Sequence, residues 1–346
     1  MDDIRRGGFF RTLRRDFEEL KEFMLSDERK ERLKGMNRLK RRLYIAGWLL
    51  RSLFLKLTPA RRILLFIAFL SIFNGIYYHG SQFSIEINLA GFILLFILML
   101  ELKDKLVARE ELEAGHAVQE ALAPERSPEV SGWKLWLFTR SANEVGGDLV
   151  DFIRVDGDRL GVALGDVAGK GLRAALLTAK LQAILRAIVP DFLSLDELGK
   201  KLNQIFYRDR LPAMFASIVY LEVRPGAGMI RLMNAGHFLP LILRESSVQM
   251  MEKGGPALGI LPDALFSEQR IELSKGDKLL VYSDGLTEAR NERGEFFGEQ
   301  RLLEMLPPLY RFSAAELGER LVAETDRFLG RARPNDDLSI AIIERE

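Results

Sequence analysis

Four aspartates lie beside glycine or other small residues at the ends of short apolar runs: Asp148, Asp166, Asp284 and Asp336. Carboxylates that converge on one point repel each other and shift towards the neutral form unless a cation neutralises them. Hard divalent ions such as Mn²⁺ or Mg²⁺ prefer an oxygen-only set of ligands. Two such ions that share a carboxylate can activate a water for in-line attack at phosphorus. The pattern therefore predicts hydrolysis of a phosphate ester.

Each acid has a simpler interpretation when it is taken alone, because aspartate beside glycine is ordinary turn chemistry. Glycines next to the acids, such as Gly146 and Gly147, would let backbone groups approach an ion closely. Lys170 and the start of the helix that follows it offer positive charge to a phosphate. We therefore name Lys170 and Gly147 as candidate substrate contacts.

The composition narrows the available chemistry to carboxylates. The chain has no cysteine and three histidines, His79, His116 and His237. Disulfides, thiolate zinc sites and cysteine nucleophiles are thereby excluded, and imidazole chemistry has few residues to draw on. His237 could act as a general acid, although a hydrogen-bonded structural histidine is the simpler prediction, and His116 is expected at an exposed surface.

The elements that would position the acids follow Pro124. Short apolar runs with turn signals between them predict strands over 134–140, 151–155, 159–164, 216–223, 229–234, 239–244, 278–282 and 338–343. Helical spacing of apolar residues predicts helices over 171–188, 195–207 and 314–329. Because strands and helices come in blocks, the fold class is α+β with largely antiparallel sheets.

The N-terminal part differs in charge and apolarity. Residues 1–110 carry a net charge of +8, which leaves −7 for residues 111–346 against the chain total of +1. Two runs without charged residues, 63–78 and 88–100, approach the roughly 20 residues that a bilayer span needs. We therefore expect an α-helical transmembrane hairpin over 63–102, with two buried core helices as the alternative.

Basic residues ahead of the hairpin decide its expected orientation. Residues 1–62 hold 18 Lys+Arg against 9 Asp+Glu, and the link between the apolar runs has neither Lys nor Arg. The positive-inside rule then places both termini and the domain 124–346 in the cytoplasm of a multi-pass membrane protein with two spans. The arm 1–62 should lie at the membrane surface and bind anionic lipid. Nucleic acid is the weaker alternative, and we expect no such partner.

A linker helix over 103–123 should join the hairpin to the domain, because no proline or turn cluster interrupts residues 89–122. Its leucines at 102, 106, 112 and 122 are loosely compatible with a two-helix coiled coil. The sequence thus predicts a homodimer through this helix, with a solvated connector as the alternative.

Six motifs give the acids a shared context: EVGGDLVDF (144–152), GDVAGKG (165–171), NAGHFLP (234–240), GGPALGI (254–260), YSDGLTEARN (282–291) and NDDLSI (335–340). In their order and spacing, the chain from about Glu111 onward resembles the bacterial serine/threonine phosphatases of the metal-dependent PPM (PP2C-like) class. The branch is that of stage II sporulation protein E and the phosphatases acting on anti-anti-sigma factors. The resemblance implies a PP2C-like α-β-β-α sandwich of antiparallel sheets flanked by helices, which makes 124–346 a PPM-type phosphatase domain.

The resemblance also implies roles for individual residues. Asp166 would bridge two Mn²⁺ or Mg²⁺ ions beside the Val167 backbone oxygen, with Asp148, Asp284 and Asp336 completing the sites. Asp337 could exchange places with its neighbour Asp336 in a one-residue shift. The activated water would attack a phosphoserine or phosphothreonine of a protein, with an anti-anti-sigma-factor-like regulator as the expected partner.

Two other functions remain open at this point. A scaffold could bind a phosphorylated partner at the membrane without turnover, although the four intact acids argue against it. A small-molecule phosphoesterase could use the same metals, but the sequence has no Walker-type nucleotide-binding loop.

Overall fold

The described part of the chain comprises residues 57–79, 85–209, 214–245 and 247–346 of a computed structural model, with positions 37, 40, 44, 45, 47, 48, 51, 54 and 55. The chain divides into two compact units, Met1–Val107 and Ala108–Glu346. Most of the predicted basic arm 1–62 lies outside the described residues, so its placement stays a prediction.

The first unit contains α4 (Pro59–His79) and the beginning of α5 (Ile85–Leu122). Among the described residues, no helix combines the length and the apolarity that a membrane crossing requires. Charged residues limit the apolar runs: α4 begins beside Arg61, whose guanidinium pairs at 2.6 Å with both Glu101 and Asp104 of α5. The predictions of a transmembrane hairpin over 63–102 and of a two-span membrane location are therefore wrong, and the expected lipid partner loses its basis.

The long helix was correctly predicted from the lack of a breaker, since α5 runs without interruption from Ile85 to Leu122. The described residues belong to one copy of the chain, so the homodimer through residues 103–123 stays a prediction.

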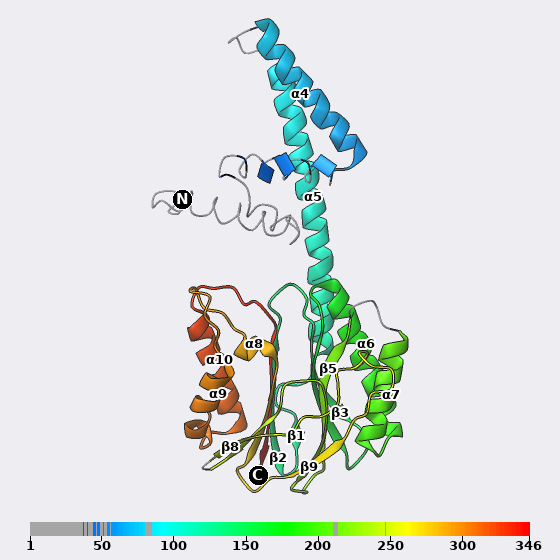
Figure 1. The fold of residues 1–346 in the computed structure, drawn as a ribbon, viewed down its shortest axis with the longest axis vertical. Helices are drawn as coiled ribbons and strands as arrows, with labels where there is room; N and C mark the ends of the chain where they lie inside the picture. Colours follow the sequence, from blue (N-terminus) through cyan, green and yellow to red (C-terminus); the bar gives the residue numbers. More distant parts are fainter. Residues whose placement is uncertain are drawn as a thin grey trace. The chain divides into compact units, whose positions relative to one another are not determined.

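The second unit is built from two antiparallel sheets (Figure 1). The six-stranded sheet has the order β1-β2-β11-β10-β7-β8 and the five-stranded sheet the order β3-β4-β5-β6-β9. The strands are β1 (Glu129–Val130), β2 (Trp133–Arg140), β3 (Asp148–Arg154), β4 (Leu160–Val167), β5 (Ala216–Val223), β6 (Met229–Ala235), β7 (Leu241–Arg244), β8 (Ser247–Met250), β9 (Glu268–Glu272), β10 (Lys278–Tyr282) and β11 (Leu338–Arg345).

Helices cover the outer face of each sheet, as Figure 1 shows. The five-stranded sheet packs against α6 (Leu172–Ile188) and α7 (Leu195–Arg208), with the short η2 (Val189–Asp191) between them. The six-stranded sheet packs against α8 (Asp284–Thr287), α9 (Glu299–Met305), η3 (Pro307–Leu309) and α10 (Ala314–Leu329). The predicted α+β sandwich of antiparallel sheets flanked by helices is confirmed.

Alternation along the strands explains why the sandwich has three cores. In β3, Val150 faces the core between the two sheets, whereas Leu149 and Ile153 face the core under α6 and α7. In β2, Leu135 and Leu137 face inward and Trp136 faces the helices of the other side. Successive side chains of a strand point to opposite faces, so both faces of each sheet are buried.

A buried histidine links the two sheets. His237 Nε2 lies 3.1 Å from the carbonyl oxygen of Tyr282 in the six-stranded sheet, and its Nδ1 lies 2.8 Å from the Ser217 hydroxyl in the five-stranded sheet. A carbonyl can only accept, so Nε2 donates to Tyr282 and Nδ1 accepts from Ser217. Burial lowers the pKa of His237 to about 4, which supports a neutral structural imidazole.

This histidine should make stability depend on pH. The unfolded chain takes up the proton near pH 6.5, whereas the folded chain resists it down to about 4. The histidine's contribution to stability is therefore full above pH 6.5 and is lost as the pH falls towards 4, by roughly 3 kcal/mol in all. In urea unfolding between pH 7 and 5, His237→Gln should remove this contribution from the pH dependence. The control His116→Gln should keep it; equal slopes in wild type and both variants would contradict the prediction.

Gly318 tests the packing of α10 on the six-stranded sheet. A Cβ at this position would overlap the Trp136 ring, so Gly318→Ala should lower the free energy of unfolding by about 1–3 kcal/mol despite alanine's higher helix propensity. Gly115→Ala is the matched control, since its Cβ would lie at an ordinary 3.4 Å from Val145 Cγ1. Thermal unfolding should show a lower midpoint for Gly318→Ala and an unchanged or higher one for Gly115→Ala; the reverse order would refute the packing account.

Candidate metal centre

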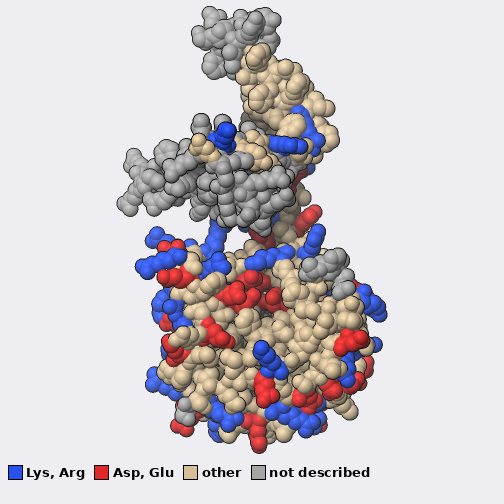
Figure 2. Space-filling model, in the orientation of Figure 1, with Lys and Arg blue, Asp and Glu red and all other residues tan. Residues whose placement is uncertain are grey.

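Strand ends bring the predicted acids towards one edge of the sandwich. Asp148 begins β3 and lies directly opposite Asp166, near the end of β4. On the other sheet, Asp284 begins α8 immediately after β10, and Asp336 precedes β11, the antiparallel neighbour of β10. Figure 2 shows acidic side chains gathered in a recess of the second unit near α8. Residues that are far apart in the sequence thus share one region.

The charges of these acids influence one another. Burial, followed by the negative charges of Asp284 and Asp336, raises the pKa of Asp166 to about 7. Burial and then Asp336 raise the pKa of Asp284 to about 6. Burial also raises the pKa of Asp148 well above its usual range, with Asp166 and Asp337 acting in the same direction. The cluster therefore holds more negative charge than its surroundings neutralise.

Asp336 and Asp337 differ in their contacts although they are adjacent. Asp337 is buried, and its carboxylate accepts backbone N–H groups from Ala142 at 2.7 Å and Gly147 at 2.6 Å. The Asp336 carboxylate is half-buried and lies 2.9 Å from Lys170 Nζ. Asp337 thus holds the loop 142–147 through backbone N–H groups. Asp336 instead faces the exposed ammonium group of Lys170.

Glycine at position 285 lets the two strand ends approach each other. A Cβ on Gly285 would collide with the Asp337 carbonyl oxygen. The same carbonyl accepts the Ser283 hydroxyl at 3.0 Å, and Ser283 in turn accepts the Ser339 N–H at 2.9 Å. These contacts fix Asp284 beside the segment that carries Asp336.

The other candidate residues lie in the same region. Lys170 also donates to the Asn335 carbonyl at 2.6 Å, and its side chain is 59% exposed, so it stands at the rim. The Gly147 N–H donates to Asp337, and its carbonyl accepts from Thr178 Oγ1 at 2.5 Å, so both polar groups of Gly147 have protein partners. The backbone oxygen of Val167 also lies close to Gly147: it is 3.2 Å from the position that a Cβ on this glycine would take.

The donor set suits a hard divalent cation. Within the described ranges, no three acidic or histidine side chains are gathered closely enough to form a metal cage alone. Mg²⁺, however, is usually held by one or two carboxylates and keeps several waters. Asp148 Oδ2 is buried and has no hydrogen-bond partner in the described part of the chain. An unpaired buried oxygen beside mutually repelling carboxylates fits an ion that would neutralise them.

Sequence reasoning missed three groups at this edge. Glu288 contributes to the raised pKa of Asp284. It could have been found from the sequence, because it lies within the motif YSDGLTEARN, four residues after Asp284. Thr178 and Gln119 contact Gly147 and Gly146 respectively. Their sequence neighbourhoods give no signal, because these contacts join separate elements.

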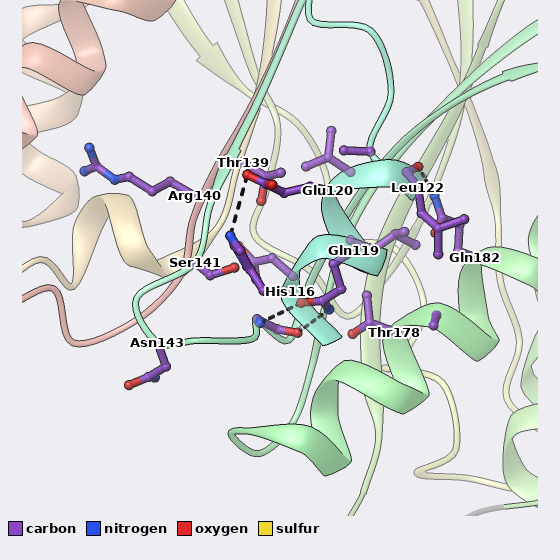
Figure 3. A pocket seen from close by; sticks show the side chains of 16 residues that line it. His116, Gln119, Glu120, Leu122, Thr139, Arg140, Ser141, Asn143, Thr178 and Gln182 are labelled. Carbon is purple, nitrogen blue, oxygen red and sulfur yellow. Dashed lines mark hydrogen bonds and ion pairs between the residues drawn. The ribbon is translucent and has the colours of Figure 1, made fainter. Parts of the chain in front are cut away.

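A cavity of about 500 Å³ lies behind Asp148, lined by the end of α5, the end of β2, the following loop and α6. Figure 3 shows Gln119 and His116 of α5 and Gln182 of α6 around it. His116 pairs with Glu120 at 3.6 Å, while its buried Nδ1 has no hydrogen-bond partner among the described residues. The other acids of the cluster do not line this cavity.

Comparison with known proteins assigns the fold and the family. Residues 156–346 match the Stage II sporulation protein E (SpoIIE) family, a range that begins after Asp148. Protein IcfG of Synechocystis is 29% identical over 234 residues, covering 60% of this chain and 37% of IcfG. Phosphoserine phosphatase RsbU of Bacillus subtilis is 24% identical over 240 residues, covering 69% of this chain and 71% of RsbU.

A solved structure shares the fold of the second unit. The SiaA-PP2C domain of Pseudomonas aeruginosa superposes with a TM-score of 0.62 at 21% identity, covering 72% of this chain and 99% of that domain. That likeness shows the PP2C-like fold. Because the family match extends over more than half of the 346 residues, the chain belongs to the Stage II sporulation protein E family and carries its PP2C-like phosphatase domain.

Proposed function

We propose that this chain is a metal-dependent protein serine/threonine phosphatase that hydrolyses phosphoserine or phosphothreonine in a regulator of the anti-anti-sigma-factor type. The observation that carries the proposal is the group of interacting carboxylates Asp148, Asp166, Asp284 and Asp336, with raised pKa values at the first three. Phosphate hydrolysis follows from the chemistry of such a set, and the family membership makes a phosphoprotein the substrate class.

The chain's own residues would divide the work as follows. Asp148, Asp166, Asp284 and Asp336, with the Val167 carbonyl oxygen, would hold two Mn²⁺ or Mg²⁺ ions. When bound, the ions would supply a deprotonated water and neutralise charge on the phosphate. Lys170 stands at the rim with its ammonium 2.9 Å from Asp336, so it can turn from this carboxylate to a substrate phosphate.

The relatives support the substrate class from their printed names. RsbU is named a phosphoserine phosphatase, and the six motifs between residues 144 and 340 together resemble the branch that acts on anti-anti-sigma factors. The chain spans 37% of the length of IcfG. The substrate of this chain is therefore inferred from its phosphatase domain alone.

Two substitutions test the reaction. With Mn²⁺ present, wild type should hydrolyse p-nitrophenyl phosphate and a phosphoserine peptide, and Asp166→Asn and Asp284→Asn should each lose at least 100-fold in kcat/KM, because the charge that binds the ion is removed. Lys180→Met, which breaks an exposed pair with Asp209, is the control and should retain activity. Equal inactivity of wild type and both aspartate variants would favour a phosphoprotein-binding scaffold; hydrolysis of nucleotides but of no phosphopeptide would favour a small-molecule phosphoesterase.

The adjacent acids Asp336 and Asp337 should separate in experiment. Asp336→Asn should raise the Mn²⁺ concentration for half-maximal activity with little change in the unfolding midpoint, because within the described part of the chain its carboxylate accepts no backbone N–H other than that of Asp337. Asp337→Asn should lower the unfolding midpoint, since one carboxylate oxygen that accepts backbone N–H groups becomes an amide donor. Thermal unfolding and Mn²⁺ titration of the two variants decide the roles; swapped effects would make Asp337 the ligand.

A further inference from the structure

The turn Gly146–Gly147, directly before Asp148, receives most of its hydrogen bonds from side chains. Gly146 is buried and lies between β2 and β3, outside both. Gln119, near the end of α5, donates from Nε2 to the Gly146 carbonyl at 3.0 Å and accepts the Gly146 N–H through Oε1 at 3.1 Å. One carboxamide therefore pairs both backbone polar groups of one buried residue, as a neighbouring strand would.

Three side chains from three elements hold this turn. Gln119 of α5 pairs with Gly146. Asp337, ahead of β11, accepts the Gly147 N–H at 2.6 Å, and Thr178 of α6 donates to the Gly147 carbonyl at 2.5 Å. Both polar groups of Gly146 are thus paired by a side chain, whereas the Gly147 carbonyl also accepts the Val167 N–H of β4 at 3.2 Å.

We propose that Gln119 is a positioning residue for Asp148: it fixes the Gly146 peptide and through it the direction of the Asp148 carboxylate. This inference rests on the proposed function, in which Asp148 is a metal ligand. Residues that orient a ligand from outside affect metal affinity, typically by 10- to 100-fold when they are removed.

The chemistry at position 119 calls for a carboxamide. A glutamate could accept the Gly146 N–H but would face the Gly146 carbonyl with a second oxygen, and two acceptors cannot pair. A methionine fills nearly the same space and offers neither bond. Both groups of Gly146 would then be left without their partner, although the packing of α5 on the loop is kept.

Gln182 offers a matched control on the opposite wall of the same cavity (Figure 3). Its Nε2 donates to the Leu122 carbonyl at 3.1 Å, so it also joins the end of α5 to the domain. It makes no hydrogen bond to residues 146–148 that the structure shows, and the Leu122 carbonyl keeps a second donor in Arg186 at 3.3 Å. Any effect of loosening α5 should therefore appear in both variants, and an effect on Asp148 in one alone.

The experiment compares full-length wild type, Gln119→Met and Gln182→Met. Hydrogen exchange measured by mass spectrometry should be faster over residues 142–148 in Gln119→Met alone. Mn²⁺ binding, followed by the electron paramagnetic resonance signal of the free ion, should weaken about tenfold in Gln119→Met and stay within twofold of wild type in Gln182→Met. The Mn²⁺ concentration for half-maximal hydrolysis should rise in parallel, while KM for a phosphopeptide at saturating Mn²⁺ stays unchanged.

The outcomes separate the two claims. Unchanged exchange over 142–148 in Gln119→Met would overturn the inference whether or not the protein is active. An active wild type whose Mn²⁺ affinity is equal in Gln119→Met and Gln182→Met would also overturn it and leave the phosphatase function standing. A wild type that neither binds Mn²⁺ nor hydrolyses phosphate overturns the proposed function together with the role of Gln119 towards the metal.

Discussion

Several carboxylates at one end of a buried sandwich set the main physical constraint on this domain. Burial and mutual repulsion raise the pKa values of Asp148, Asp166 and Asp284 together. The free energy cost of holding these groups near one another has to be offset by the surrounding fold or by a cation. The packing of both sheets offsets part of this free energy cost, because each strand that carries or adjoins one of these acids has buried side chains on both faces.

The arrangement of the site depends on Gly285 and on the carboxylate of Asp337. Gly285 allows the start of α8 to touch the backbone at Asp337. Asp337 in turn uses its carboxylate on backbone amides of the 142–148 loop. A carboxylate that accepts such bonds is a good structural anchor. In the proposed function the neighbouring Asp336 is then the metal ligand, so that support and metal binding would lie in consecutive positions.

Sequence patterns predicted the local features and missed the distant ones. The strands 216–223 and 278–282 and the helix 314–329 were predicted with the bounds that the structure has, because alternation and helical spacing report burial directly. The short β8 and β9 were missed, since strands of four and five residues with exposed positions carry little periodicity.

The candidate site shows the same division. Asp148, Asp166, Asp284 and Asp336 could be named because acids at strand ends, three of them next to a glycine, leave a local signal. The roles of Asp337 and Gln119 could not be predicted. Asp337 contacts Gly147 across 190 positions of sequence, and Gln119 contacts Gly146 across 27. The membrane hairpin was wrong because no helix among the described residues is long and apolar enough, and Arg61 pairs with Glu101 and Asp104 at the ends of the apolar runs.

The place of β11 has a consequence for how the site is assembled during folding. This strand follows all others in sequence, yet it lies between β2 and β10 in the middle of its sheet. Its partner β2 is about two hundred positions earlier, so loop closure of that length precedes their pairing. Until β11 inserts, the loop before Asp148 has no Asp337 to hold it. Completion of the acidic centre is therefore coupled to the least local pairing in the sheet, and a chain in which β11 has not yet paired does not present the finished set of acids.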